Sequence, residues 1–117
     1  MASPAIPTPG LQIKIEKKPE ETVIHGTGKI TSDTSASLQS TVRGLIPETK
    51  RIVLDLTDVE YIDSSGLGAL VTLYMAANRV QCNLELTNPK PRIRDLFKVS
   101  KLASVFEGHG ENYFGGF

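Results

Sequence analysis

The spacing of apolar residues predicts strands and helices in alternation along most of the chain. Residues 11–16 alternate between apolar and polar side chains, the period of two of a half-buried strand, and residues 22–28 predict a second strand that returns beside it. Residues 51–56 form a nearly continuous apolar run, which is typical of a central strand covered on both faces. Residues 82–87 alternate again and predict a further strand.

The segments between and after these strands have apolar residues at the spacing of helices. Leu38, Val42, Leu45 and Ile46 predict a helix that ends at Pro47 and begins at a cap provided by Ser32, Asp33 or Thr34. Residues 64–79 predict a second helix, with Leu67, Leu70, Val71, Tyr74 and Asn78 on one stripe. Residues 89–99 predict a short amphipathic helix, and residues 100–106 a last helical turn or two.

This order of elements defines the expected fold class, a single α/β domain with a small mixed sheet packed by about four helices. Residues 51–87 form a β-α-β unit, whose crossover is expected to be right-handed and whose strands are expected to be parallel. We expect a flexible leader at residues 1–10, the folded domain at 11–107 and a glycine-rich tail at 108–117.

Composition narrows the function classes. The 117 residues carry 13 Lys and Arg against 13 Asp and Glu, so general binding to nucleic acid is not expected. The single cysteine, Cys82, excludes an intramolecular disulfide, and with only His25 and His109 beside it a zinc site is not expected. Neither a membrane span nor a signal peptide is recognisable, which predicts a cytoplasmic chain without membrane attachment.

Residues 55–68 form the segment that suggests chemistry. We expect the strand at 51–56 to lead through an acidic turn into Ser64 and Ser65, which open the next helix. The free N–H groups and the positive dipole end of that helix would stabilise an anion such as a phosphate. The structural alternative is that Asp63 or Ser64 only caps the helix, and that Gly66 and Gly68 only allow close packing.

Specific residues of this segment argue against an enzyme active site. The glycine spacing lacks the lysine of a phosphate-binding P-loop, and Asp63 and Ser64 precede Ser65 where a nucleophile elbow requires a glycine. His25 lies in a predicted strand and His109 in the tail, so neither is expected to activate a serine. We therefore expect no catalytic residues, no metal and no cofactor.

The runs DLTDVEYIDSSGLGALVTLY and CNLELTNPKPRIRDLFKVSKLASVF resemble the STAS domain of bacterial anti-sigma factor antagonists. The resemblance covers roughly residues 11–107 and is most specific at residues 55–68. It implies that the second serine of D-S-S-G, here Ser65, is phosphorylated by an anti-sigma factor with a serine protein kinase fold. The unphosphorylated antagonist would bind that anti-sigma factor, and a metal-dependent serine phosphatase would reverse the modification.

The same resemblance assigns the residues around Ser65. Ser64 and Gly66 complete the signature, with Ser64 as a cap or a neighbour that orients the acceptor, and Asp63 is expected to contact the kinase. The acids expected to surround a phosphate are Asp58, Glu60 and Asp63. In many antagonists an aspartate ends the second strand, whereas this chain has Thr31; Asp33 would replace that aspartate only if the loop bends differently.

A second function class stays open at this point. STAS-like domains also act as ligand or nucleotide sensors and as scaffolds, and a sensor would use the same helix N-terminus as an anion site. We expect a monomer or a weak homodimer. Alternation does not decide which of Tyr61 and Ile62 faces the core.

Overall fold

The structure is a computed structural model that describes residues 6–8 and 10–99. In chain order its elements are β1 (Ile6–Thr8), β2 (Leu11–Lys17), β3 (Thr22–Ile30), α1 (Ser35–Leu45), the 3-10 helix η1 (Ile46–Glu48), β4 (Arg51–Ile62), α2 (Ser64–Arg79), β5 (Asn83–Thr87) and α3 (Pro91–Val99). The helical turns predicted at 100–106 and the tail at 108–117 lie outside the described residues.

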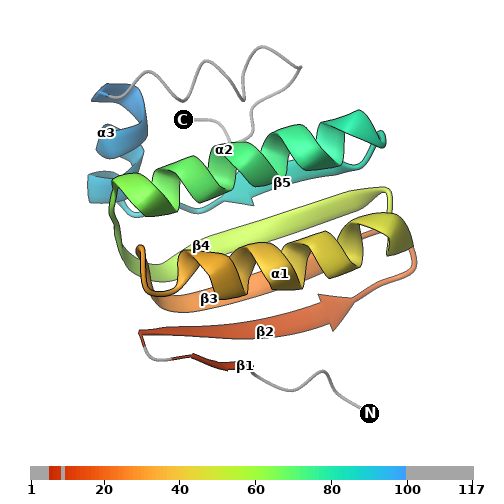
Figure 1. The fold of residues 1–117 in the computed structure, drawn as a ribbon, viewed down its shortest axis with the longest axis horizontal. Coiled ribbons are helices and arrows are strands. Elements are labelled where there is room, and N and C mark those ends of the chain that lie inside the picture. The colour runs from red at the N-terminus through yellow and green to blue at the C-terminus, as the bar shows by residue number, and fades with distance from the viewer. Residues whose placement is uncertain (1–5, 9, 100–117) are drawn as a thin grey trace.

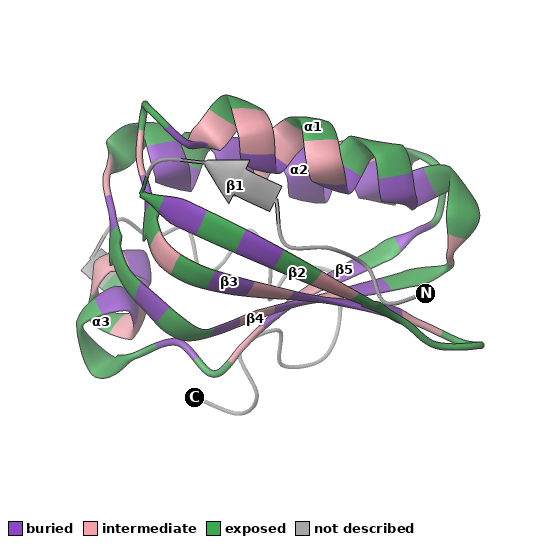
Figure 2. Cartoon of the chain, turned by 90° about the horizontal axis from the view of Figure 1, so that it is seen from below, coloured by how far each residue is buried: buried purple, intermediate pink, exposed green. Residues whose placement is uncertain are grey.

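The five strands form one mixed sheet in the order β1-β2-β3-β4-β5 (Figure 1). β1, β2 and β3 pair antiparallel, whereas β3, β4 and β5 pair parallel. Each parallel pair is joined through a helix, α1 between β3 and β4 and α2 between β4 and β5. Because both crossovers step the same way along the sheet, α1 and α2 lie on the same face (Figure 2). The α/β class and the predicted β-α-β unit are confirmed.

The core lies between the helices and the sheet. Ile24 and Leu54 face it from the sheet, Leu38 and Val42 from α1, and Leu73 from α2, all with side chains at most 1% exposed. The buried face of α2 is wider than the predicted stripe and ends differently. It includes Gly66, Leu67, Ala69, Leu70, Leu73, Tyr74 and Ala77, whereas Asn78 is exposed.

Part of the expected leader is ordered in the sheet. Ile6–Thr8 form β1, which among the described strands lies at the edge of the sheet and pairs with β2 through Ile6↔Ile13, Pro7↔Gln12 and Thr8↔Leu11. Proline lacks a backbone donor, so it is tolerated on a strand whose other side carries no ladder. Residues 6–8 of the expected leader thus form a strand at the edge of the sheet.

The predicted acidic turn after residue 56 is also wrong, because β4 continues to Ile62. The register with β3 shifts between His25↔Asp55 and Thr27↔Asp58, and again between Gly28↔Val59 and Lys29↔Tyr61. At each shift β4 has one residue more than β3, so β4 keeps its pairing through bulges.

The two faces of β4 are unequally covered. Ile52, Leu54 and Leu56 point to the helices and are buried, whereas Val53 and Asp55 on the other face are of intermediate exposure. The expectation of a strand fully covered on both faces is therefore not met. The apolar run misleads because Val53 fills a position on the less covered face.

α2 ends in a Schellman motif without a glycine. The N–H of Cys82 donates to the carbonyl of Ala77 (2.9 Å) and the N–H of Gln81 to that of Asn78 (3.2 Å). Gln81 has a φ of 62°, in the left-handed region where glycine is normally preferred. The chain then passes through β5 to α3 (Figure 1). α3 is a short amphipathic helix that contacts β4.

Candidate functional site

The site lies where β4 passes into α2, and Asp63 caps the helix there. Its backbone is extended, and its Oδ1 accepts a hydrogen bond from the N–H of Gly66 at 2.8 Å. Its Oδ2 accepts from the N–H of Ser32 at 3.2 Å. One carboxylate thus joins the first turn of α2 to the loop between β3 and α1.

Gly66 is required by a close approach of backbones. A Cβ at this position would lie 2.1 Å from the carbonyl oxygen of Ile30 and 2.9 Å from Cγ2 of Ile62. The N–H of Asp63 donates to the same Ile30 carbonyl at 3.2 Å. The first turn of α2 is therefore seated directly on the end of β3. Gly68 has open space instead, so close packing explains Gly66 but not Gly68.

Ser64 and Ser65 are the first two residues of α2, and both are exposed. Backbone N–H groups in the first turn of a helix have no acceptor within the helix, and the N-terminal dipole favours negative charge there. Of these donors, the N–H of Gly66 is bound by Asp63. The predicted placement of both serines at an exposed helix start is met.

Thr31 and Asp33 lie in the loop that Asp63 holds. The side chain of Thr31 accepts from the N–H of Asp33 at 3.3 Å. The buried Thr34 hydroxyl donates to the carbonyl of Lys29 and accepts from the N–H of Thr31, both at 2.9 Å. Thr31 thus serves the fold of the loop, and the carboxylate of Asp33 is exposed beside it.

Of the acids expected around Ser65, Asp63 lies at the start of α2, whereas Asp58 lies further back along β4. Asp58 lies within β4, paired with Thr27, four residues before the end of the strand, which is about 13 Å at the usual rise per residue. Asp55 is bonded on the sheet to Thr57, Asn88 and His25. Of the acids at 55–63, Asp63 alone is bonded to the first turn of α2.

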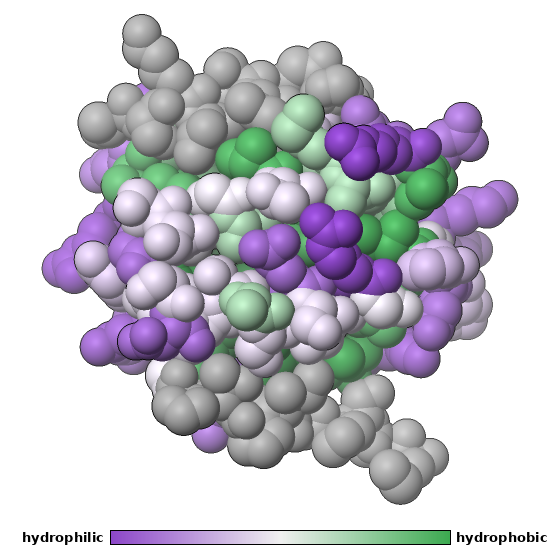
Figure 3. Space-filling model, viewed as in Figure 1, coloured by the Kyte–Doolittle hydropathy of each residue, from purple (hydrophilic) through white to green (hydrophobic). Residues whose placement is uncertain are grey.

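The helical layer around Ser65 is almost uncharged. α1 and α2 contain no acidic residue, and their only charged residues are Arg43 and Arg79, both in last turns. Figure 3 shows pale residues of intermediate hydropathy over much of these two helices. The exposed positions of α2 include Ser65, Gly68, Thr72 and Met75.

An apolar groove of about 540 Å³ adjoins Ser64. It lies between the β4–α2 junction and α3, and its lining residues are Tyr61, Ile62, Asp63, Ser64, Arg92, Ile93, Asp95 and Leu96. Ile62 faces the core at 3% exposure, whereas Tyr61 is 46% exposed, which settles the alternative left by the sequence.

His25 has specific partners that the sequence pattern did not reveal. Its Nδ1 lies 3.0 Å from Oδ2 of Asp55, and its Nε2 lies 3.2 Å from Oε1 of Glu16. Partial burial acts to raise the pKa of Asp55, but hydrogen bonds from Thr57, Asn88 and His25 outweigh burial and hold the pKa below its usual value. The strand register sets His25 directly across from Asp55 of β4, and Glu16 of β2 reaches the ring from the position paired with Val23; no local sequence signal indicates these contacts.

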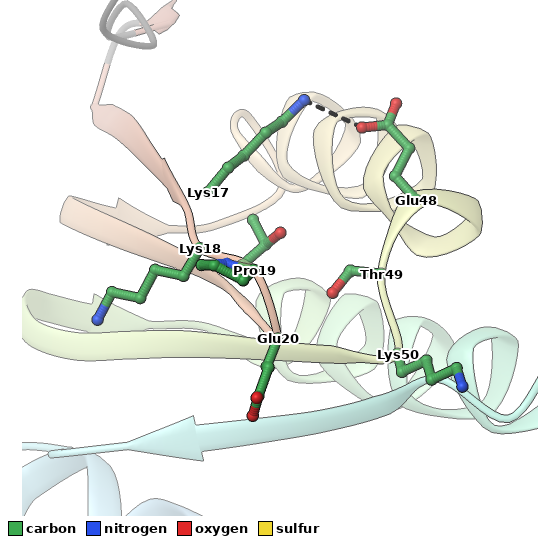
Figure 4. Close-up of a pocket in the computed structure, with 8 residues that line it drawn as sticks. Lys17, Lys18, Pro19, Glu20, Glu48, Thr49 and Lys50 are labelled. Atoms are coloured by element: carbon green, nitrogen blue, oxygen red, sulfur yellow. Dashed lines mark hydrogen bonds and ion pairs between the residues drawn. The ribbon is translucent and has the colours of Figure 1, made fainter.

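A second, polar groove of about 610 Å³ lies at the other end of β3, between the β2–β3 connection and the residues before β4 (Figure 4). Lys17 and Glu48 form an ion pair of 3.0 Å across it, and both side chains are largely exposed. Exposed pairs of this kind contribute little stability.

Two further findings concern the described part of the chain. Among residues 6–8 and 10–99, no group of three or more His, Cys, Asp and Glu side chains is arranged to hold a metal ion. Within the same ranges, the helices are too short or too polar to span a membrane.

Comparison with known proteins identifies the family. The model of the STAS domain matches residues 12–113, and the chain belongs to this family. In solved structures, the fold is shared with an anti-sigma factor antagonist from Mycobacterium paratuberculosis (TM-score 0.77, 18% identity, 100% of this chain and 92% of that one). It is also shared with the antagonist SpoIIAA in its unphosphorylated form (TM-score 0.67, 22% identity, 77% and 81%).

Curated relatives match over a shorter segment. The putative anti-sigma factor antagonist BtrV of Bordetella bronchiseptica is 37% identical over 57 residues, which cover 49% of each chain. An anti-sigma-B factor antagonist of Listeria monocytogenes is 35% identical over 54 residues, which cover 46% of this chain and 47% of that one. The chain thus spans about half the length of the curated relatives it matches.

Proposed function

We propose that this chain is an anti-sigma factor antagonist, a non-enzymatic switch that binds an anti-sigma factor when Ser65 is unphosphorylated and releases it when Ser65 is phosphorylated. The observation that carries the proposal is the capped, exposed start of α2, where Ser64 and Ser65 stand on a helix seated on β3 by Gly66. The relatives named as antagonists, and a neighbour described in an unphosphorylated form, support the same function.

The electrostatic reason for the switch lies in the neutral helical layer. A phosphate on Ser65 adds about −1.5 to −2 charges. It would stand beside helices that contain no acidic residue, so a partner surface matched to a neutral hydroxyl would meet a concentrated new charge. The helix dipole would tolerate the phosphate within the folded domain, so binding is lost without unfolding.

The groove beside Ser64 extends the proposed contact surface. Tyr61 and Leu96 offer apolar area, and Arg92 and Asp95 offer charges of both signs at the same place. Interfaces of this composition bind an apolar side chain within a polar rim. The proposed partners are an anti-sigma factor of the serine protein kinase type and a metal-dependent serine phosphatase, in the cytoplasm.

The experiment combines the purified chain with ATP and each kinase-like anti-sigma factor of the source genome. We expect one of them to add a single phosphate, mapped to Ser65 by mass spectrometry. The Ser65→Ala variant is expected to keep binding this partner, and Ser65→Asp to bind it about tenfold or more weakly because charge is introduced at the contact.

Ser64→Ala is the matched control, since it removes the neighbouring exposed hydroxyl of the same turn. Its phosphorylation should persist. Modification that maps to Ser64 overturns the assignment of Ser65 but keeps the switch. Equal binding by Ser65→Ala and Ser65→Asp, with no phosphorylation by any candidate, contradicts the proposal as a whole.

The groove also supports a second candidate, a ligand or nucleotide sensor, because its volume of about 540 Å³ lies beside the N-terminus of α2. Calorimetry of the unphosphorylated chain with nucleotides separates the two. Micromolar binding favours the sensor, and the absence of heat favours the antagonist.

A further inference from the structure

His25 occupies the sheet face opposite α1 and α2. In the strand register it stands directly across from Lys14 of β2 and Asp55 of β4, and its chain neighbour Ile24 points into the core. The His25 side chain is 39% exposed and that of Asp55 is 21% exposed. The ring is thus accessible to solvent protons while fixed between two strands.

Both ring nitrogens of His25 face carboxylate oxygens, at 3.0 Å from Asp55 and 3.2 Å from Glu16. A neutral imidazole has one N–H and one bare nitrogen that only accepts, and a carboxylate has no proton to donate. The two contacts therefore form together only when both nitrogens carry a proton.

The groups around His25 are arranged so that the contacts to Glu16 and Asp55 depend on the second ring proton of His25. Asp55 is held in place independently of His25, because its Oδ1 accepts from the N–H of Thr57 (3.1 Å), the Thr57 hydroxyl (2.6 Å) and the amide of Asn88 (3.3 Å). On β2, the charged neighbours are Glu16 and Lys14, and Lys14 opposes the imidazolium charge. α1 and α2 lie on the other face and bring no charge to it.

We propose that His25 is a pH-sensitive clamp across β2, β3 and β4: when protonated it joins Glu16 to Asp55, and loss of its proton releases one of these two contacts. The clamp occupies a sensitive position, because His25↔Asp55 is the last matched pair before the first register shift of β4. Beyond this pair the two strands run through both bulges to the pair Ile30↔Ile62, directly before Asp63. This inference does not depend on the proposed function.

The sign of the pH effect follows from the charge. The lowered pKa of Asp55 keeps its carboxylate ionised at pH 5.5, and the clamp is closed while His25 is protonated; as the pH rises and the imidazolium loses its proton, the clamp opens. The His25→Gln variant should therefore melt about 2–4 °C below the wild type at pH 5.5 and less than about 1 °C below it at pH 8.5. His109→Gln is the matched control for loss of a histidine and should show no such pH-dependent difference.

A direct measurement uses the His109→Gln protein, in which His25 is the only histidine. At pH 5.5 both ring N–H protons of His25 should be observable by NMR, since hydrogen bonds protect them from exchange, and one should be absent at pH 8.5. Backbone amides of Thr27 and Asp58 should exchange faster at pH 8.5 after correction for the intrinsic pH dependence. Equal melting differences at both pH values, or fewer than two protected ring protons at pH 5.5, overturn the proposal.

Discussion

Two glycines at the start of α2 tolerate substitution very differently, although they lie close together in the sequence. Gly66 has no room for a methyl group because the Ile30 carbonyl is in the way, whereas Gly68 faces open space. The sequence shows two glycines in one helix turn and does not distinguish them. The distinction depends on the end of β3, which comes from a distant part of the chain.

This difference gives a matched pair of variants. Gly66→Ala is expected to lower the free energy of unfolding by about 2 kcal/mol or more, because the Ile30 backbone must shift. Gly68→Ala is expected to raise it by about 0.5–1 kcal/mol through helix propensity. Urea unfolding of both variants measures this, and equal effects of the two would contradict the packing argument.

At the scale of the elements, α2 is specified at both ends by hydrogen bonds. Asp63 closes its N-terminus, and the Schellman bonds of Gln81 and Cys82 close its C-terminus. The sequence predicted this helix with its correct bounds, 64–79, because an Asp-Ser-Ser start precedes a clear apolar period. The continuation of β4 to Ile62 was missed, since bulges that pair with β3 leave no regular alternation in the sequence.

The C-terminal end of α2 includes a residue with an unfavourable backbone conformation, which a substitution can relieve. Gln81 holds a φ of 62°, which an L-residue with a Cβ adopts unfavourably. We expect Gln81→Gly to raise the free energy of unfolding by about 0.5–1 kcal/mol without changing the fold, as measured by chemical denaturation. As a control, Asn78→Gly, inside the same helix, should lower it by a few tenths of a kcal/mol; stabilisation by both would argue against a conformational cause.

At the scale of the whole molecule, charge is divided between the two faces. The helical layer is nearly neutral, and the other face of the sheet carries networks such as Glu16–His25–Asp55 and Arg51 bonded to Glu85 and Glu21. The sequence predicted that Asp58, Glu60 and Asp63 surround Ser65. Asp63 lies at the start of α2, whereas the extension of β4 to Ile62 sets Asp58 four residues before the end of the strand.

The hydrogen bonds of Asp55 can be tested by measuring the free energy of unfolding at low pH. Its folded pKa lies below the usual value, so its contribution is present above that value and lost as the pH falls through the lowered pKa. We expect the difference in unfolding free energy between the wild type and Asp55→Asn to be full at pH 5 and to shrink below about pH 4. Asp58→Asn serves as the control; a difference for Asp55→Asn that is constant down to pH 2 would contradict the assignment.

The order of the strands also bears on how the molecule assembles during synthesis. Since β1 to β5 lie in the sheet in the order in which they occur in the chain, each strand that leaves the ribosome meets a neighbour that has already been made. The β2–β3 pair, joined by a short connection, provides the first partner, and α1 and α2 each have time to form before the strand that follows them is needed. The sheet can therefore grow from one edge to the other, and the helix that carries Ser65 is completed on a surface that already exists.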